Sequence, residues 1–181
     1  TKRPVVFGAA TMSGAGDLTA SGKLPISSIS DNFDDNVVAA KWSETETGGA
    51  TVTETGERLE CAVPGAAVAE ASLRSLGPYD LTGDATFVRL VSPGLNNSAN
   101  LGAGFALCDA GSAANAVWFT VAANTLVFGY TVASVDNTTN LTYSAANHAW
   151  LRLTNSGANV LWQTSGDGET WTRRRTVATA I

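Results

Sequence analysis

The chain has 181 residues, of which 44% are apolar and 15% are charged. That length and apolar content are enough for a folded core, so a chain disordered throughout is excluded. The net charge of −5 argues against a nucleic-acid partner, because nucleic-acid binding depends on clustered Lys and Arg. No apolar run approaches the roughly 18 residues that a membrane-spanning helix needs, so we expect no membrane span.

The first 30 residues differ in composition from the rest of the chain. Residues 8–22 consist mainly of small residues punctuated by glycine, and they bury too little apolar surface to fold alone. Apolar residues flank this stretch at 5–7 and 24–26. We therefore expect residues 1–30 to form an extended N-terminal arm that becomes ordered against another subunit, and residues 31–181 to form one domain.

An acidic loop follows the arm, with the sequence DNFDDN over residues 31–36. Its carboxylates, Asp31, Asp34 and Asp35, are hard oxygen ligands of the kind that calcium takes from loops. Asp and Asn are also frequent in ordinary turns, where their side chains bond to the backbone. A structural calcium ion is therefore the one cofactor that the sequence suggests, and we expect no other.

From residue 51 onward, runs rich in β-branched and aromatic residues are separated by Gly, Pro, Asn and Asp. Turn signals at intervals of about 8–14 residues are typical of an all-β sandwich. No helical periodicity competes with this pattern. The expected strands cover residues 51–55, 58–63, 69–75, 84–92, 100–108, 115–122, 125–133, 139–143, 149–155, 158–164 and 169–177.

Alternation within an expected strand assigns its side chains to faces. In residues 149–155, Leu151 and Leu153 take the core side, whereas Trp150 and Arg152 take the other side. A slip of one residue would bury the arginine without a partner, which is costly. The sequence therefore predicts a strand with one apolar face and one polar, aromatic face.

Three further features have plain structural interpretations. Residues 173–175 are all arginine and fit a solvated edge strand, in which the outer two share a face and the middle one takes the other. The alternative for this run is a contact to an acidic neighbouring subunit. His148 is expected to be a partly exposed histidine at a strand entry. Cys61 and Cys108 lie in separate expected strands and are either free thiols or, if those strands are neighbours, a disulfide.

Two sequence patterns mark the beginning and the end of the expected domain. Residues 31–42 open with D.F.D and close with Lys-Trp. Residues 149–172 are expected to form two successive hairpins. The sequence reads WLRL, then a turn that contains a glycine, and then W.TS.DG.TW. Together these motifs resemble the concanavalin A-like lectin/glucanase superfamily over residues 31–175. The resemblance implies a jelly-roll (concanavalin A-like) β-sandwich of two antiparallel sheets.

The small-residue stretch 8–22 is similar to the leaders of minor tail proteins from phages that infect actinobacteria. The combined resemblance implies a non-enzymatic bacteriophage virion protein, either a minor tail protein or a capsid decoration protein, on the tail or capsid surface. Its expected partners are other virion subunits, bound through the arm, and a host-surface glycan, so we expect an oligomer in the assembly. The alternative is an extracellular carbohydrate-binding module of a secreted bacterial enzyme or adhesin.

Tryptophan side chains are the candidate glycan contacts, because an indole ring offers an apolar platform with a polar handle. Trp118 and Trp150 are the surface candidates, since the residues next to each of them in the strand point to the other side and can fill the core. Together with Arg89 and Arg152 they are expected to line a shallow face that contacts glycan or protein.

Catalysis is not expected. Retaining glucanases hold two carboxyl groups about 5–5.5 Å apart across the scissile bond. The nearest match, Glu44 with Glu46, falls in an expected polar loop after Trp42 and lacks a further carboxylate. No nucleophile elbow of the Gly-x-Ser-x-Gly type accompanies His148.

Overall fold

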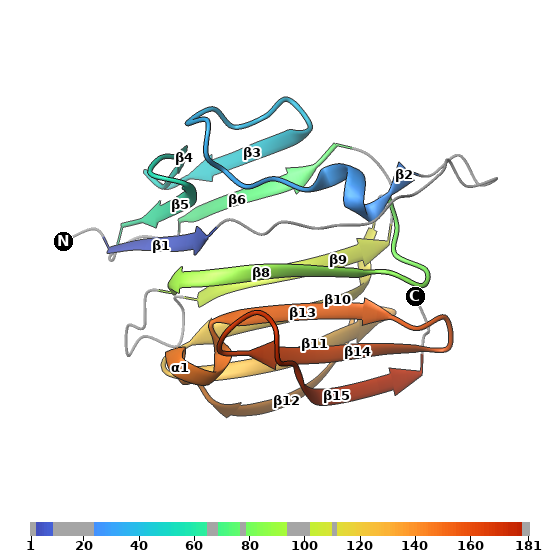
Figure 1. The fold of residues 1–181 in the computed structure, drawn as a ribbon. Helices are drawn as coiled ribbons and strands as arrows, with labels where there is room; N and C mark the ends of the chain where they lie inside the picture. Colours follow the sequence, from blue (N-terminus) through green and yellow to red (C-terminus); the bar gives the residue numbers. More distant parts are fainter. Residues whose placement is uncertain are drawn as a thin grey trace. The chain divides into compact units, whose positions relative to one another are not determined.

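The computed structural model describes residues 3–8, 24–64, 69–76, 79–93, 102–109 and 112–178. Apart from a 3-10 turn at Ile26–Ile29 and the short helix α1 at Ala145–His148, the elements of these residues are strands. The longer strands all pair antiparallel (Figure 1). The expected all-β class is confirmed. No helix of the described residues has the length and apolar composition to cross a membrane.

The chain divides into two compact units, one of Thr1–Leu81 with Thr86–Gly94 and the other of Thr82–Ala85 with Leu95–Ile181. The first unit contains a sheet in the order β8, β1, β5, β4 and two smaller pairs, β3 with β6 and β2 with β7. The bounds of its strands are β1 Arg3–Gly8, β2 Leu24–Pro25, β3 Trp42–Thr47, β4 Thr51–Glu54, β5 Arg58–Val63, β6 Glu70–Ser75, β7 Tyr79–Asp80 and β8 Ala85–Ser92.

Part of the expected arm is a sheet strand. β1 pairs antiparallel with β5 on one side and with β8 on the other. Its residues are too few to signal a strand in the sequence, and the partners that complete it are about fifty and eighty residues away in the chain. The remainder of the arm, residues 9–23, lies outside the described residues.

The prediction of a polar loop after Trp42 is wrong. Residues 42–47 form β3, which pairs with β6 from Trp42 opposite Ser75 to Thr47 opposite Glu70. Every residue of this strand after the tryptophan is Ser, Glu or Thr. The strand therefore has no apolar alternation for sequence analysis to detect, and its backbone pairing with β6 is what defines it.

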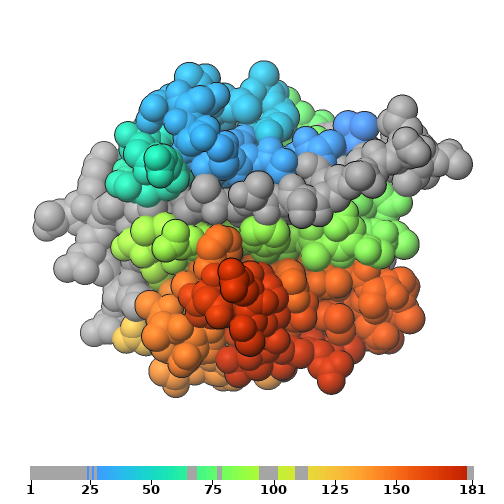
Figure 2. Space-filling model, viewed as in Figure 1, coloured from blue at the N-terminus to red at the C-terminus, as the bar shows by residue number. Residues whose placement is uncertain are grey.

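The second unit contains two sheets, one in the order β12, β11, β10, β9 and the other formed by β13, β14 and β15. Their bounds are β9 Gly102–Asp109, β10 Ser112–Ala122, β11 Thr125–Val132, β12 Val135–Thr142, β13 Trp150–Asn155, β14 Asn159–Ser165 and β15 Thr172–Ala178. In the space-filling view, the orange and red residues of β13–β15 form the near side of this unit (Figure 2).

The two sheets of the second unit pack face to face around aromatic side chains. Phe119 and Phe128 meet edge to face with their ring centroids 5.6 Å apart. Trp162 of β14 is completely buried, and its indole N–H donates to the backbone oxygen of Trp118 in the opposite sheet at 3.0 Å. Arg175 of β15 likewise donates to the backbone oxygen of Phe128. The unit is therefore a sandwich held by both apolar and polar contacts.

The predicted faces of residues 149–155 are confirmed. Leu151 and Leu153 are buried, with exposed fractions of 2% and 0%, whereas Trp150 and Arg152 are half-buried on the other side of β13. The predicted faces of the arginine run are wrong, because β15 has a bulge. Its first arginine pairs with Gln163 and its last with the buried Trp162, so these two lie on opposite faces.

Sequence analysis also missed the first half of β12. The expected strand covered 139–143, whereas β12 begins at Val135 after a tight turn at Ala133 and Ser134. Both turn residues have positive φ, 48° and 65°. Neither is the Gly or Asn that usually signals such a hairpin turn, so the turn had no signature in the sequence.

The left-handed backbone at Ser134 predicts a stabilising substitution. Ser134→Gly should raise the free energy of unfolding by roughly 1 kcal/mol, because glycine adopts positive φ without steric cost. Ser144→Gly is a matched control, since Ser144 has a φ of −139° and glycine there should bring no gain. Urea unfolding of both variants measures the difference, and an equal effect at the two sites would contradict the prediction.

Complete burial of Leu153 predicts a large cavity effect. Leu153→Ala should lower the free energy of unfolding by about 2–5 kcal/mol. Thr138→Ala, on an exposed part of β12, should change it by less than about 0.5 kcal/mol. Chemical unfolding followed by tryptophan fluorescence measures both values, and a silent Leu153→Ala would invert the assignment of faces.

Candidate functional site

The outward side of the β9–β12 sheet carries one aromatic ring, Trp118. The pairing registers place Trp118 of β10 beside Ala106 of β9 and Gly129 of β11, and Gly129 beside Thr138 of β12. The neighbours of Trp118 along β10 are buried in the sandwich. These four residues therefore form a row across the outer surface of the sheet.

The ring of Trp118 lies over Gly129. A Cβ atom built on this glycine would lie 2.1 Å from Cε2 of Trp118, so only glycine leaves room for the ring in this position. The indole N–H donates to Oγ1 of Thr131 at 3.3 Å, and the Thr131 hydroxyl donates to Oδ1 of Asp136 at 2.7 Å. The orientation of the half-buried ring is thus set by packing on one side and hydrogen bonds on the other.

Small and polar side chains surround this ring. On β9 the exposed outward residues are small, and on β12 they are polar and carry hydroxyl, amide or carboxylate groups. They are Gly102, Gly104, Ala106 and Cys108 on β9, and Asp136, Thr138, Asn140 and Thr142 on β12. We call this surface, with Trp118 at its centre, the Trp118 face. An open aromatic platform beside hydrogen-bonding groups is suited to a polar ligand with an apolar side.

The remaining surface candidates lie elsewhere. Trp150 and Arg152 are on the outer side of β13, in the sheet opposite Trp118, so the single shallow face expected from the sequence does not form. The guanidinium of Arg152 stacks 4.0 Å from the Trp171 ring centroid, and its Nε donates to Oε1 of Gln163. Arg89 is exposed on β8 in the other unit.

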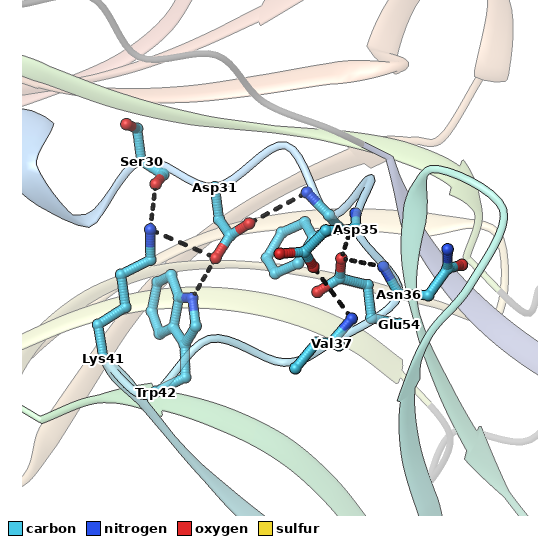
Figure 3. A network of polar contacts seen from close by, with 9 residues as sticks. Ser30, Asp31, Asp35, Asn36, Val37, Lys41, Trp42 and Glu54 are labelled. Carbon is cyan, nitrogen blue, oxygen red and sulfur yellow. Dashed lines mark hydrogen bonds and ion pairs between the residues drawn. The ribbon is translucent and has the colours of Figure 1, made fainter.

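The calcium candidates of the acidic loop have separate surroundings (Figure 3). Oδ2 of Asp31 accepts the indole N–H of Trp42 at 2.8 Å and lies 3.4 Å from Nζ of Lys41. Asp34 is exposed and accepts a bond from Asn32. In the part of the chain that the structure describes, no three His, Cys, Asp or Glu side chains are grouped as in a metal cluster. Asp31 therefore anchors the loop to β3.

Sequence analysis missed Glu54, which the structure places beneath the same loop. Its Oε1 accepts the backbone N–H groups of Asp35 at 3.1 Å and Asn36 at 3.0 Å. Burial, with the neighbouring carboxylates of Asp35 and Asp31, raises the pKa of Glu54. The one signal in the sequence was strand alternation, because Glu54 stands two residues after Val52 and so shares the core-facing side of β4 with it.

Both cysteines and the histidine are now placed. Cys61 and Cys108 form no disulfide, and burial raises the pKa of the Cys61 thiol to about 11.

The prediction that His148 is partly exposed is wrong, because only 5% of this residue is exposed. Its Nδ1 accepts the backbone N–H of Ser144 at 2.9 Å, which requires a neutral ring with the proton on Nε2. Closure of α1 over the end of β14 accounts for this burial.

Comparison of the chain with protein-family models, with curated proteins and with solved structures found no match.

The surroundings of His148 predict a specific pH dependence. Burial and the charge of Arg174 lower its pKa in the folded state, so below its ordinary pKa of about 6.5 the unfolded chain binds more protons than the folded one. The free energy of unfolding should therefore fall as the pH drops through 6.5 and be unaffected by this group above it. Urea unfolding between about pH 5 and pH 8 should show a smaller decline for His148→Gln. An identical pH profile for the two proteins would contradict this account.

Proposed function

We propose that this chain is a non-enzymatic, glycan-binding β-sandwich of the concanavalin A-like jelly-roll type, and that it serves as a bacteriophage virion protein on the tail or capsid surface. The single observation that carries the binding function is the Trp118 face. The virion assignment is supported by the sequence resemblance and by the kind of binding that this face suits.

The chemistry of the Trp118 face favours a saccharide. A sugar ring has an apolar side of C–H groups that stacks on an indole, and hydroxyl groups around its rim that need hydrogen-bond partners. Thr138 and Asn140 of β12 offer such partners beside the ring. Because Trp118 is already oriented by Gly129 and Thr131, little side-chain entropy is lost on binding.

An open face of this kind suits weak binding by many copies. A flat surface buries little of a ligand, in contrast to an enclosed pocket. Affinity then rises when many linked sites engage one surface, as on a particle that meets a cell wall. Binding by many copies favours a minor tail or capsid decoration protein, in either case oligomeric in the assembly. The N-terminal arm remains its proposed contact with other subunits.

Binding without catalysis remains part of the proposal. Glu46 accepts the backbone N–H of Val52, so one carboxylate of the Glu44–Glu46 pair is engaged in holding the turn between β3 and β4. The alternative, a carbohydrate-binding module of a secreted bacterial enzyme or adhesin, would use the same Trp118 face. The two differ in whether the chain is found in assembled particles or joined to an enzyme or adhesin.

Affinity for glycans tests the proposal directly. Binding of the full chain to a glycan array and to insoluble actinobacterial cell-wall polysaccharide should fall at least about tenfold in Trp118→Ala, because one stacked ring contributes on the order of 1.4 kcal/mol or more. Gly129→Ala keeps the tryptophan but displaces its ring, and should lose binding as well.

Trp150→Ala is the matched control, since it removes the same side chain from the opposite side of the unit. It should leave glycan binding unchanged, and near-ultraviolet circular dichroism should show that all three variants are folded. Retention of binding by Trp118→Ala, or its loss in Trp150→Ala alone, would overturn the assignment to the Trp118 face.

A further inference from the structure

Two carboxyl groups face each other between the acidic loop and β4. Glu54 is only 7% exposed, and its Oε2 is buried without a hydrogen-bond partner among the described residues. Figure 3 shows the carboxylate of Asp35 beside it. Oδ1 of Asp35 accepts the backbone N–H of Val37, so both carboxyl groups are held in place by the backbone of the same loop.

Among the described residues, no ion pair joins a basic side chain to Asp35 or Glu54. The ion pairs described in the first unit join Lys41 to Asp31 and Arg58 to Glu60. Oε1 of Glu54 has two backbone donors, but its buried Oε2 has none among the described residues. A buried carboxylate oxygen without a donor or a counter-charge is costly, and a second carboxylate beside it adds repulsion. A cation between the two groups would remove both costs.

We propose that Asp35 and Glu54 bind a calcium ion that fastens the acidic loop to β4. Calcium takes six to eight oxygen ligands in flexible geometry, and accepts backbone carbonyl groups and water beside carboxylates. Magnesium requires near-ideal octahedral geometry, which an irregular loop with left-handed residues at Phe33 and Asn36 does not favour.

This site differs from the one that the sequence suggested and does not depend on the Trp118 face. Asp31 is committed to Lys41 and Trp42, and Asp34 is exposed and turned toward Asn32. Two carboxylates give a modest charge, so the dissociation constant should fall in the range of about 10⁻⁴–10⁻³ M that is typical of extracellular modules.

Calcium titration of the full chain tests the site. Calorimetry with calcium chloride should show one site, and roughly 10 mM calcium should raise the melting temperature by about 3–10 °C, more than the same concentration of magnesium. Asp35→Asn and Glu54→Gln should each weaken calcium binding at least about tenfold, by loss of one ligand charge.

Asp34→Asn is the matched control, because it removes one carboxylate from the same loop without touching the pair. It should bind calcium like the unmodified chain. The proposal is overturned if calcium gives neither heat nor a rise in melting temperature, if magnesium acts equally, or if Asp34→Asn loses binding while Glu54→Gln keeps it. If Glu54→Gln does not fold, Asp35→Asn decides the outcome alone.

Discussion

The hydrogen bond from Trp162 to the backbone of Trp118 joins the two sheets of the second unit at its centre. The donor is a completely buried indole, and the acceptor is a carbonyl of β10. A buried indole N–H without a partner would be costly, so this bond fixes how the sheets lie on each other. Because alternate side chains of β10 point to opposite sides, the same arrangement places the ring of Trp118 outward, over Gly129.

In the first unit, polar groups attach the acidic loop to the neighbouring strands. Asp31 bonds to Trp42, and Glu54 bonds to two backbone N–H groups of the acidic loop. These bonds attach the loop to β3 and β4, beside the contact of its Phe33 ring with the Trp42 ring. Oε2 of Glu54 has no hydrogen-bond partner in the part of the chain that the structure describes. A cation at this position would give it a partner, in keeping with the general rule that buried charges are paired.

The alternation of side chains along a strand therefore has a different result in each unit. In the second unit, alternation separates an apolar interior from a surface that displays a single aromatic ring among small and polar side chains. In the first unit, the same alternation turns Glu54 inward with Val52. The first result is an outward-facing, half-buried aromatic ring, and the second is a buried carboxyl group beneath the acidic loop.

By itself the sequence determined the all-β class, most strand positions from residue 51 onward and the faces of β13, because alternation and turn residues are local signals. It did not determine β3, the first half of β12, or the opposite faces of Arg173 and Arg175. These depend on pairing with distant strands and on a bulge, which leave no local pattern. Only the tertiary structure separated Trp118 from Trp150 and brought Glu54 to Asp35, because the side that a residue shares with others depends on how the sheets pack.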